Sequence, residues 1–595
     1  MNQPQPSPAW GAGPALFWLA IALSILAYLR ALGFAFVYDD LPQILDTPLI
    51  RSFESWPAFF TQDIWAHKSA DPTGTYYRPL YLLWLATNYQ FFGIDPMGWH
   101  ATSIFVHALV TGLVYHFARA VGATSATASI AALLFAVHPI HVESVAWISA
   151  IVDPLCGLFM LAAAICHQRA RDAKRTSQQV LLGAGALVAC SLALLSKEIG
   201  ATFPFFIFAL ELLRERPNGG LRPVKRLVQA SLFALPYALL VVGYLTVRVS
   251  VIGSVAHNAA GIGVFESLLS TPAVVLHYLR LFVFPVGLSA EYGLRVIRSA
   301  TDPSFIWSSV GCLAVLAGLI IFYVKQRSAR GIIGVSAAWA VVSVGPALIL
   351  WMLQPDSFVH DRYLYISSVG LCIATAVMFQ ALPSGRFVAF GRPAGPIVTT
   401  ATVITLFAIL TVYQSAYWRN GLTLFQRAAT QAPHVAHAQT NFGVELLRAG
   451  KLDRAEAVFR QVLDTDADNW FATYGTGQAY LFRGEPKKAV GYLERAVKLL
   501  PHRADQYLHL GFAHRAARSA TRAEAAFREA IRRQPSGLKQ HFGLAMSLLD
   551  QGRLTEALKA FEAEVALNPS QADAHRYIDA LRERLSPKPP SVEDQ

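Results

Sequence analysis

WFATYGTGQAYLFRGEPKKAVGYLERAVKLLPHR, residues 470–503, is the segment that decides the fold of the C-terminal part of this chain. Its register recurs before and after it at a spacing of 34 residues. Four series share that spacing: Gly443, Gly477, Gly511 and Ala545; Ala455, Ala489, Ala523 and Ala557; Phe459, Leu493, Phe527 and Phe561; and Ala467, Pro501, Pro535 and Pro569. Small residues at fixed positions let two antiparallel helices pack closely, and proline ends the second helix. The segment is therefore one unit of a helical solenoid.

A period of 34 residues with this register is typical of the tetratricopeptide repeat (TPR). It predicts four repeats and a capping helix, over 436–469, 470–503, 504–537, 538–571 and 572–585. The last residues, 586–595, have the composition of a disordered tail. We expect the concave surface to bind an acceptor protein or an assembly partner, with Asn441, Tyr474 and Tyr507 lining it. A scaffolding role without chemistry is the ordinary alternative.

The part of the chain before the repeats has the composition of a membrane protein. The 595 residues are 54% apolar and only 15% charged, and long stretches before residue 420 carry no charge. A net charge of +12 would suggest nucleic-acid binding. We expect no nucleic-acid partner, because many Lys and Arg residues lie in short loops between apolar segments, where they orient a membrane protein. The five cysteines all lie in apolar segments, so no disulfide framework is predicted.

Thirteen apolar segments are candidates for crossing the membrane, which takes about 20 residues as a helix. They are 14–37, 77–93, 98–118, 125–142, 150–168, 180–196, 199–213, 227–247, 271–288, 304–324, 331–352, 363–382 and 396–417. Thirteen crossings would place basic clusters on both sides, against the positive-inside rule. We therefore predict eleven crossings, with 77–93 and 271–288 as interfacial helices. The first of these holds Arg78 and the second Arg280.

This arrangement predicts the sidedness of the chain. After an N-terminal tail over 1–13, the membrane domain covers 14–420, and its first apolar segment is a retained span rather than a cleaved signal peptide. The N-terminus and the basic clusters face the cytoplasm, and the repeats lie outside. Two large loops, 38–97 and 248–303, then face outward.

Two adjacent carboxylates, Asp39 and Asp40, follow the first span. Neighbouring carboxylates repel each other, so keeping both requires a cation, a bound substrate or good solvation. The ordinary alternative is a solvated helix cap. These two residues are the first candidates for chemistry.

A second polar group ends the third predicted crossing, in the stretch HPIHVE over 138–143. Pro139 stops or kinks the helix and so brings polar side chains to the outer face. The members of this group are His138, His141, Glu143 and, a little further on, Asp153. A polar helix terminus is the ordinary interpretation, and the His spacing is weak evidence for a metal site.

Three cations lie on the same predicted face: Arg78, Lys197 and Arg362. Each alone is more often an interfacial residue whose charged end reaches water. Together they could bind a phosphate, for which arginine is well suited.

These motifs, in this order, resemble the transmembrane and TPR repeat-containing O-mannosyltransferases, which belong to the GT-C glycosyltransferases. The resemblance covers nearly the whole chain. It rests on Asp39-Asp40, HPIHVESVAWISAIVDPL (138–155), LLSKE (194–198), DRYLYISSVG (361–370) and the repeats. The chain departs from the family at 150–152, where Ala-Ile-Val stands in place of a basic residue before Asp153.

The resemblance implies an all-α, GT-C-like membrane domain and an inverting transfer of a hexose, mannose in this family. The donor would be a polyprenyl-phosphate sugar and the acceptor a protein Ser or Thr hydroxyl, in a bacterial inner membrane with the repeats on the periplasmic side. Asp39 or Asp40 would be the general base. Arg78, Lys197 and Arg362 would contact the donor phosphate, and the HPIHVE group would shape the pocket. No resident cofactor is implied, and a divalent metal stays open.

Two other functions are compatible with the same sequence. The first is a non-catalytic membrane scaffold whose repeats recruit envelope proteins or act in polysaccharide assembly. The second is a transporter or lipid flippase, which is disfavoured because the charged residues gather at one membrane face and no inverted repeat is evident.

Overall fold

The computed structural model describes residues 13–65, 76–214, 223–254, 261–354, 357–382, 388–389, 392–569 and 571–586. The predicted tails, except Gly13 and Ser586, and parts of the basic clusters at 214–226 and 386–392 lie outside these residues. Apart from Asp46–Pro48 and a separate short segment that begins at Asp63, the chain divides into two compact units between Val435 and Ala436. We call them the membrane unit and the repeat unit.

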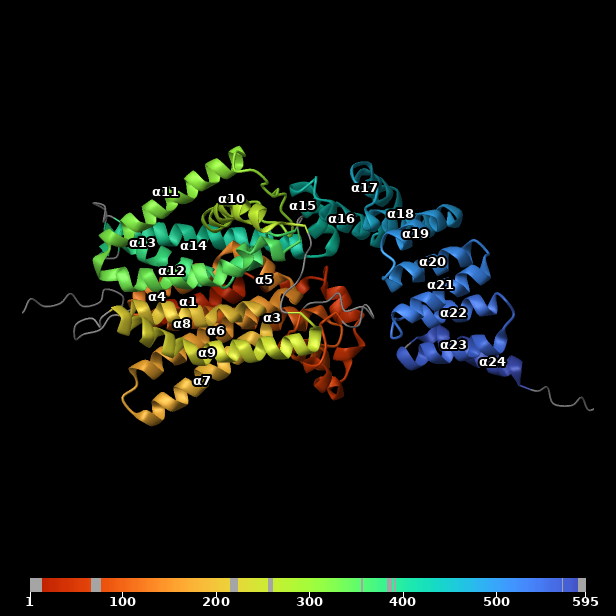
Figure 1. Cartoon of the computed structure of the whole chain (residues 1–595), viewed down its shortest axis with the longest axis horizontal. Helices are drawn as coiled ribbons and strands as arrows, with labels where there is room; N and C mark the ends of the chain where they lie inside the picture. Colours follow the sequence, from red (N-terminus) through yellow and green to blue (C-terminus); the bar gives the residue numbers. More distant parts are fainter. Residues whose placement is uncertain are drawn as a thin grey trace, which may run out of the picture. The chain divides into compact units, whose positions relative to one another are not determined.

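The membrane unit consists of helices, most of them joined by short connections, with a longer non-helical segment over 284–302 (Figure 1). Its α-helices are α1 (Gly13–Leu26), α2 (Pro79–Phe92), α3 (Pro96–Ala120), α4 (Ser125–Val137), α5 (Val142–Ala146), α6 (Val152–Asp172), α7 (Thr176–Ser196), α8 (Phe203–Leu213), α9 (Pro223–Ile252), α10 (Val264–Val283), α11 (Pro303–Lys325), α12 (Arg330–Val344), α13 (Ser368–Gln380), α14 (Ala394–Ser415) and α15 (Gly421–Gln431). Strands β1 (Val388–Ala389) and β2 (Arg392–Pro393) form a two-residue antiparallel pair.

Short 3-10 turns precede or follow several of these helices and carry much of the polar sequence. They are η1 (Leu29–Gly33), η3 (Pro48–Arg51), η4 (Phe53–Phe60), η5 (Pro139–His141), η6 (Ile148–Ile151), η7 (Glu198–Thr202), η8 (Arg327–Ala329), η9 (Gly345–Leu348), η10 (Leu350–Met352), η11 (Asp361–Leu364) and η12 (Ala416–Trp418). Element η2 (Leu41–Leu45) is a single π-helical turn.

Eight helical segments of the described chain are long and apolar enough to cross a membrane. The bent pair Ser125–Val137 and Pro139–Ala146, with a 51° angle at the proline, makes a ninth if counted as one span. The other two predicted crossings form α8 and α13, which at 11 and 13 residues are shorter than a full span. They are short because η7 and η11, which carry charged residues, occupy the beginning of each segment. The two segments assigned to the interface, α2 and α10, are not among the eight.

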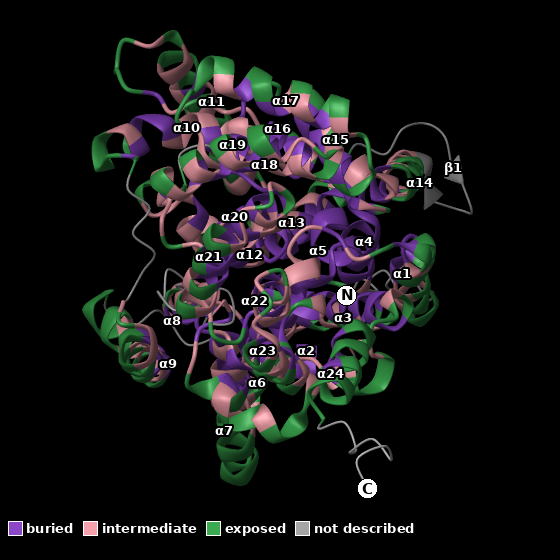
Figure 2. Cartoon of the chain, turned by 90° about the vertical axis from the view of Figure 1, so that its right-hand side faces the viewer, coloured by how far each residue is buried: buried purple, intermediate pink, exposed green. Residues whose placement is uncertain are grey.

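The centre of the membrane unit is α4, whose side chains are almost all buried. Figure 2 shows α4 and α5 in the buried colour, whereas α7 and α9 are largely exposed. Helix α11 is the most exposed of the candidate spans, with 6% of its apolar window buried. A polytopic protein exposes such apolar helices to lipid rather than to water.

The repeat unit is a run of antiparallel helix pairs. Its helices are α16 (Ala436–Arg448), α17 (Leu452–Thr465), α18 (Trp470–Arg483), α19 (Pro486–Leu499), α20 (Ala504–Ala516), α21 (Ala520–Arg533), α22 (Gln540–Leu549), α23 (Leu554–Leu567) and α24 (Ala572–Leu585). The glycine register has a direct steric reason. A Cβ placed on Gly511 would come within 2.7 Å of the Phe527 ring, and one on Gly443 within 2.5 Å of the Phe459 ring.

Candidate active site

The carboxylate of Asp40 is completely buried and holds two distant segments together. Its Oδ2 accepts a hydrogen bond from the Val37 amide at 3.0 Å. Its Oδ1 accepts from both the amide and the hydroxyl of Ser149, at 2.8 and 2.6 Å. Burial raises the pKa of Asp40 to about 7, although these hydrogen bonds lower it. Asp40 therefore joins the loop after the first span to η6.

Asp39 differs from its neighbour because it is only partly buried. It follows Tyr38, whose φ of 52° lies in the left-handed region that non-glycine residues seldom adopt. The π-helical turn Leu41–Leu45 comes directly after the pair. Strained backbone and π-turns gather at functional sites, where they aim a side chain away from the regular helix direction. The local geometry thus separates the two carboxylates that the sequence could not tell apart.

Each of the three predicted phosphate-binding cations is paired with a carboxylate from another segment. The pairs are Arg78 with Glu198, Lys197 with Asp153 and Arg362 with Glu143. Arg248 at the end of α9 also contacts Glu198, at 3.1 Å. The sequence analysis did not select Arg248, although an arginine this close to the end of an apolar helix was a usable signal.

Asp153 has no basic residue just before it in the sequence, and Lys197 pairs with it instead. The Lys197 Nζ lies 2.6 and 2.7 Å from the two carboxylate oxygens. Lys197 follows α7, so a loop distant in sequence provides a cation to this aspartate. Burial lowers the pKa of Lys197, and the positive charges of Arg78 and Arg362 lower it further.

The cations and Asp39 converge around a small group of aromatic rings. The Arg78 guanidinium lies 4.5 Å from the centre of the Tyr76 ring. Burial raises the pKa of Tyr76, and the charges of Arg78, Glu198, Arg362 and Asp39 all act on it as well. The charges of these groups therefore act on the Tyr76 hydroxyl.

Arg362 also contacts aromatic rings. Its guanidinium is 5.3 Å from the Trp147 ring and 5.2 Å from the Tyr363 ring. The Lys197 Nζ is 5.5 Å from the same Tyr363 ring. Trp147 also contacts Tyr38, next to Asp39. Aromatic faces of this kind can stabilise cations and cover the apolar face of a sugar ring.

Glu143 positions the turn that carries Arg362. One carboxylate oxygen bonds the Arg362 side chain and the other accepts from the Arg362 amide at 3.0 Å. The adjacent Asp361 accepts a hydrogen bond from Tyr292. Burial raises the pKa of Asp361 well above its usual value, and the negative charge of Glu143 adds to the effect. Asp361 and Tyr292 were not predicted as site residues.

The two histidines of the predicted pocket lie in packed interior positions. His138 accepts from the Ile140 amide at Nδ1, and its Nε2 lies 3.0 Å from the Phe282 carbonyl. His141 lies 2.8 Å from the Ser368 hydroxyl and contacts the Phe135 ring. The two imidazoles thus connect the turn at Pro139 to α10 and α13. Within the described part of the chain, no three His, Cys, Asp or Glu side chains are grouped so that they could hold a metal ion.

The predicted TPR contact residues have unequal surroundings. The Asn441 amide donates to the His437 carbonyl at 2.9 Å. Tyr474 is buried, with its hydroxyl 2.8 Å from His509 of the next repeat, so it links two repeats. Tyr507 is partly buried under the Arg533 guanidinium, 5.5 Å from the ring centre.

Comparison with known proteins gives two family matches. Residues 74–248 match the family model for dolichyl-phosphate-mannose-protein mannosyltransferase. Residues 416–469, 440–506 and 508–572 match the tetratricopeptide repeat model. The first match includes Arg78, Asp153 and Lys197, and the second covers the predicted repeats.

Several curated relatives match large parts of the chain. A protein O-mannosyl-transferase of Caenorhabditis elegans is 27% identical over 75% of this chain and 62% of its own length. Protein O-mannosyl-transferase TMTC3 of Mus musculus is 24% identical over 93% of this chain and 64% of its own length. The chain is a relative of the TMTC protein O-mannosyl-transferases. It spans less than two thirds of the length of these curated relatives.

The comparison confirms the predicted resemblance and the fold class, an all-α multi-pass membrane domain followed by a TPR solenoid. Among solved structures, a TPR protein with an unusual peptide-binding site, YrrB, is 25% identical over 27% of this chain and 82% of its own, with a TM-score of 0.24. A thermophilic TPR protein of Thermus thermophilus is 22% identical over 30% of this chain and 94% of its own, with a TM-score of 0.25.

Proposed function

We propose that this TMTC relative transfers a mannosyl group from a polyprenyl-phosphate donor to a Ser or Thr hydroxyl of a protein. The observation that carries the proposal is the grouping of a partly exposed carboxylate, Asp39, with half-buried cations: the charges of Asp39, Arg78 and Arg362 all act on Tyr76, and those of Arg78 and Arg362 act on Lys197. Acid–base chemistry needs a carboxylate in reach of the acceptor. A departing phosphate needs cations placed in advance. The relatives' names and the match over 74–248 support mannose as the sugar.

In this mechanism Asp39 accepts the proton of the acceptor hydroxyl. The hydroxyl oxygen forms a bond to the anomeric carbon on the face opposite the lipid phosphate, and the bond from that carbon to the phosphate oxygen breaks. The phosphate leaves with the electron pair, so the transfer inverts the anomeric configuration. Asp40 takes no proton in this step; it holds the Asp39 loop against Ser149.

The charges of the site fit a donor with a single negative charge. Four cations, Arg78, Lys197, Arg248 and Arg362, are paired with three carboxylates, Glu143, Asp153 and Glu198. One positive charge is therefore in excess among the paired groups. A phosphodiester carries one negative charge, and the released lipid phosphate carries more, so the excess favours the leaving group. Asp39 is the partly exposed carboxylate whose charge acts on Tyr76 together with those of Arg78 and Arg362, and we assign it to the acceptor.

The proposal places this chemistry on the outer face of a bacterial inner membrane. The basic clusters at 169–175 and 325–330 lie at the opposite helix ends from the site turns η7 and η11, in keeping with the positive-inside rule. The repeat unit would then hold the acceptor or a partner protein on the same side.

The test is transfer of labelled mannose from mannosyl-phosphoryl polyprenol to an acceptor protein by the purified chain. We expect Asp39→Asn to lower the transfer rate by 10²–10⁴-fold, the usual contribution of a general base. The matched control is Asp302→Asn, which changes a carboxylate that caps α11 at its Ser304 amide. Normal transfer by Asp39→Asn would contradict the assignment of the base.

The closed ion pairs favour a second function, a membrane scaffold that recruits partners through its repeats. Pairs such as Lys197 with Asp153 are also what a purely structural network requires. In that case Asp39→Asn would leave cellular function intact, whereas charge reversal on the repeat unit would abolish it. Comparing Asp39→Asn with a charge reversal on the repeat unit therefore tells whether the chain acts as an enzyme or as a scaffold.

A further inference from the structure

The turn between the two helices of a repeat has the same backbone conformation in all four repeats. It is centred on Gly450, Gly484, Arg518 and Gly552, whose φ angles are 69°, 82°, 57° and 75°. In each turn the amide of the next residue donates to the carbonyl five residues before it, at 2.9–3.0 Å. Glycine adopts this left-handed conformation without steric cost and commonly ends helices in this way. The third repeat is the exception, because an arginine stands where the other three have glycine.

Arg518 therefore keeps a backbone conformation that is unfavourable for a residue with a Cβ atom. Strain of this kind gathers at functional sites. The hydrogen bonds of the turn do not require an arginine, since glycine forms the same bonds in the other three repeats. What distinguishes this turn is therefore the arginine side chain and its surroundings.

A hollow of about 500 Å³ lies beside this turn, at the C-terminal ends of α20 and α22, which are neighbours in the repeat unit (Figure 1). Ligand pockets in proteins have volumes of about 300–1,000 Å³. The residues that line the hollow are Phe512, Arg515, Ala516, Arg518, Ala520 and Asp550. The hollow thus lies between the third repeat and the first helix of the fourth.

The charges in the hollow leave one arginine for a ligand. The Arg515 Nε lies 2.6 Å from the Asp550 Oδ2, and this pair links the two repeats. Arg518 is exposed, and no carboxylate among the residues that the structure describes pairs with its guanidinium. Two positive charges and one negative charge leave a single positive charge in excess. Such a site attracts an anion, and the planar guanidinium of arginine matches a carboxylate.

The rest of the lining fits the chain that carries such an anion. The half-buried Phe512 ring lies 5.1 Å from the Phe527 ring, measured between ring centres. It offers an apolar surface beside the cations, against which the methylene groups of a glutamate side chain can pack. Ala516 and Ala520 carry only methyl groups and leave room for a peptide backbone. A glutamate within an extended peptide has this combination of charge and apolar surface.

We propose that this hollow binds acidic side chains of the protein that the repeat unit holds, with Arg518 as the residue that determines specificity. The inference deepens the proposed function, because it assigns the acceptor or partner protein to a chemical class, one with an acidic segment. The strain at Arg518 is retained because glycine in its place would lose the contact with this ligand.

The test is binding of two labelled peptides to the purified full chain, measured by fluorescence anisotropy without a sugar donor. One peptide alternates serine and glutamate, and the other alternates serine and glutamine. We expect the glutamate peptide to bind about tenfold more tightly or better, the size of one hydrogen bond to a charged group. Equal affinity for the two peptides would overturn the proposal. Binding with this preference but without transfer would refute the enzyme and keep the site, and transfer without the preference would do the reverse.

The variant Arg518→Gly separates a ligand-binding role from a structural one, because it removes the cation and restores the glycine of the other three repeats. We expect it to weaken binding of the glutamate peptide about fivefold or more. Hydrogen exchange of α20 and α21 in the same variant should slow about threefold or more, since the strained conformation is relieved. Faster exchange would show that the arginine stabilises the turn, and the proposal would fail.

The matched control is Arg522→Gln. Arg522 is exposed in α21 and does not line the hollow. The variant lowers the charge of the repeat unit by one, as Arg518→Gly does, and should change the affinity for the glutamate peptide less than about twofold. Equal losses in the two variants would show that the peptide responds only to the general positive charge of the repeat unit, and would overturn the assignment of Arg518.

Discussion

Asp40 accepts three hydrogen bonds at its two carboxylate oxygens, whereas Asp39 is partly exposed beside the cations. Only the ionised form of Asp40 can accept from Val37 and Ser149 at both oxygens without rearrangement. Burial opposes that form and raises the pKa to about 7. The loop that carries Asp39 is therefore held by a group that titrates near neutral pH.

This titration predicts the pH dependence of transfer. As pH falls through about 7, Asp40 takes up a proton and one oxygen ceases to accept, which loosens the Asp39 loop. Folding raises the pKa of Asp40 to about 7, so its carboxylate ionises at a higher pH in the folded chain than in the unfolded chain. We expect the transfer rate at saturating donor to rise about tenfold between pH 6 and pH 8.

The Ser149→Ala variant tests the same contact. Loss of the hydroxyl removes one hydrogen bond to a charged group, worth about 1.5–3 kcal/mol. The midpoint of the pH profile should therefore move about one to two pH units upward. The control is Ser144→Ala, because the buried Ser144 hydroxyl has no hydrogen-bond partner in the described structure. Identical profiles for the two variants would show that the Ser149 contact does not set the titration.

At the scale of elements, the close packing of helix pairs in the repeat unit depends on glycines, which have no side chain. Gly511 in α20 faces the Phe527 ring of α21, and a methyl group would come within 2.7 Å of that ring. Gly491 in α19 has open space instead, with nothing within 4 Å of an added Cβ. The same glycine-to-alanine change therefore has opposite effects at the two positions.

We expect Gly511→Ala to destabilise the repeat unit by about 1–3 kcal/mol, the usual cost of overpacking. Gly491→Ala should stabilise it by about 0.5–1 kcal/mol, because alanine favours a helix interior over glycine. Hydrogen exchange of α20 and α21 in the full chain measures both. Equal protection in the two variants would show that the Phe527 ring moves aside without cost.

Two other elements, α8 and α13, show why a count of apolar segments overestimates the number of helices that span the membrane fully. Each begins after a charged 3-10 turn, η7 or η11, which takes part of the segment out of the apolar helix. Lys197 immediately precedes the first of these turns, and Arg362 lies within the second. The charged turns before α8 and α13 therefore place Lys197 and Arg362 at the site.

For the whole molecule, the proposed function depends on which side of the membrane each unit lies. In a chain whose native cysteines are replaced, we introduce Thr176→Cys at the start of α7 and Arg454→Cys in α17; both positions are exposed. An impermeant thiol reagent added to intact bacterial cells should label the α17 cysteine and spare the α7 cysteine. Labelling of both after membrane permeabilisation is the control. The reverse pattern would place the site on the cytoplasmic face.

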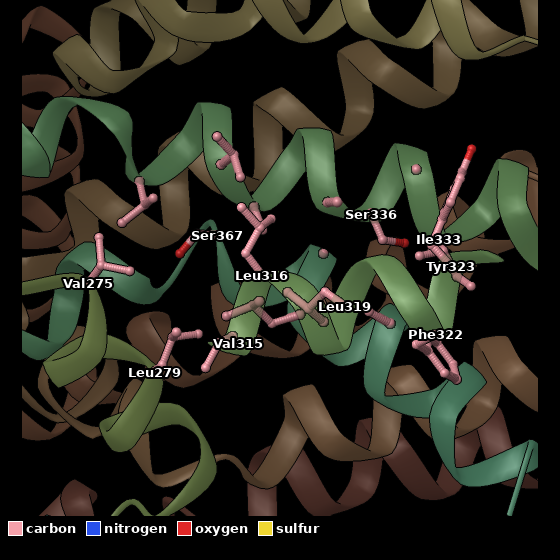
Figure 3. A pocket seen from close by; sticks show the side chains of 18 of the residues that line it. Val275, Leu279, Val315, Leu316, Leu319, Phe322, Tyr323, Ile333, Ser336 and Ser367 are labelled. Atoms are coloured by element: carbon pink, nitrogen blue, oxygen red, sulfur yellow. The ribbon is translucent and has the colours of Figure 1, made fainter. Parts of the chain in front are cut away.

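The sequence alone determined the features that depend on local periodicity: the 34-residue solenoid, the apolar helices, the Pro139 corner and the grouping of charges at segment ends. These follow from spacing along the chain, which fixes which face of a helix a residue occupies. Tertiary structure decided everything that depends on distant partners. It distinguished Asp40 from Asp39 through Ser149, 109 residues away, and it supplied Lys197 to Asp153. It also formed an apolar groove lined mainly by α10, α11, α12 and α13 (Figure 3), because a cavity exists only where several elements fail to close against each other.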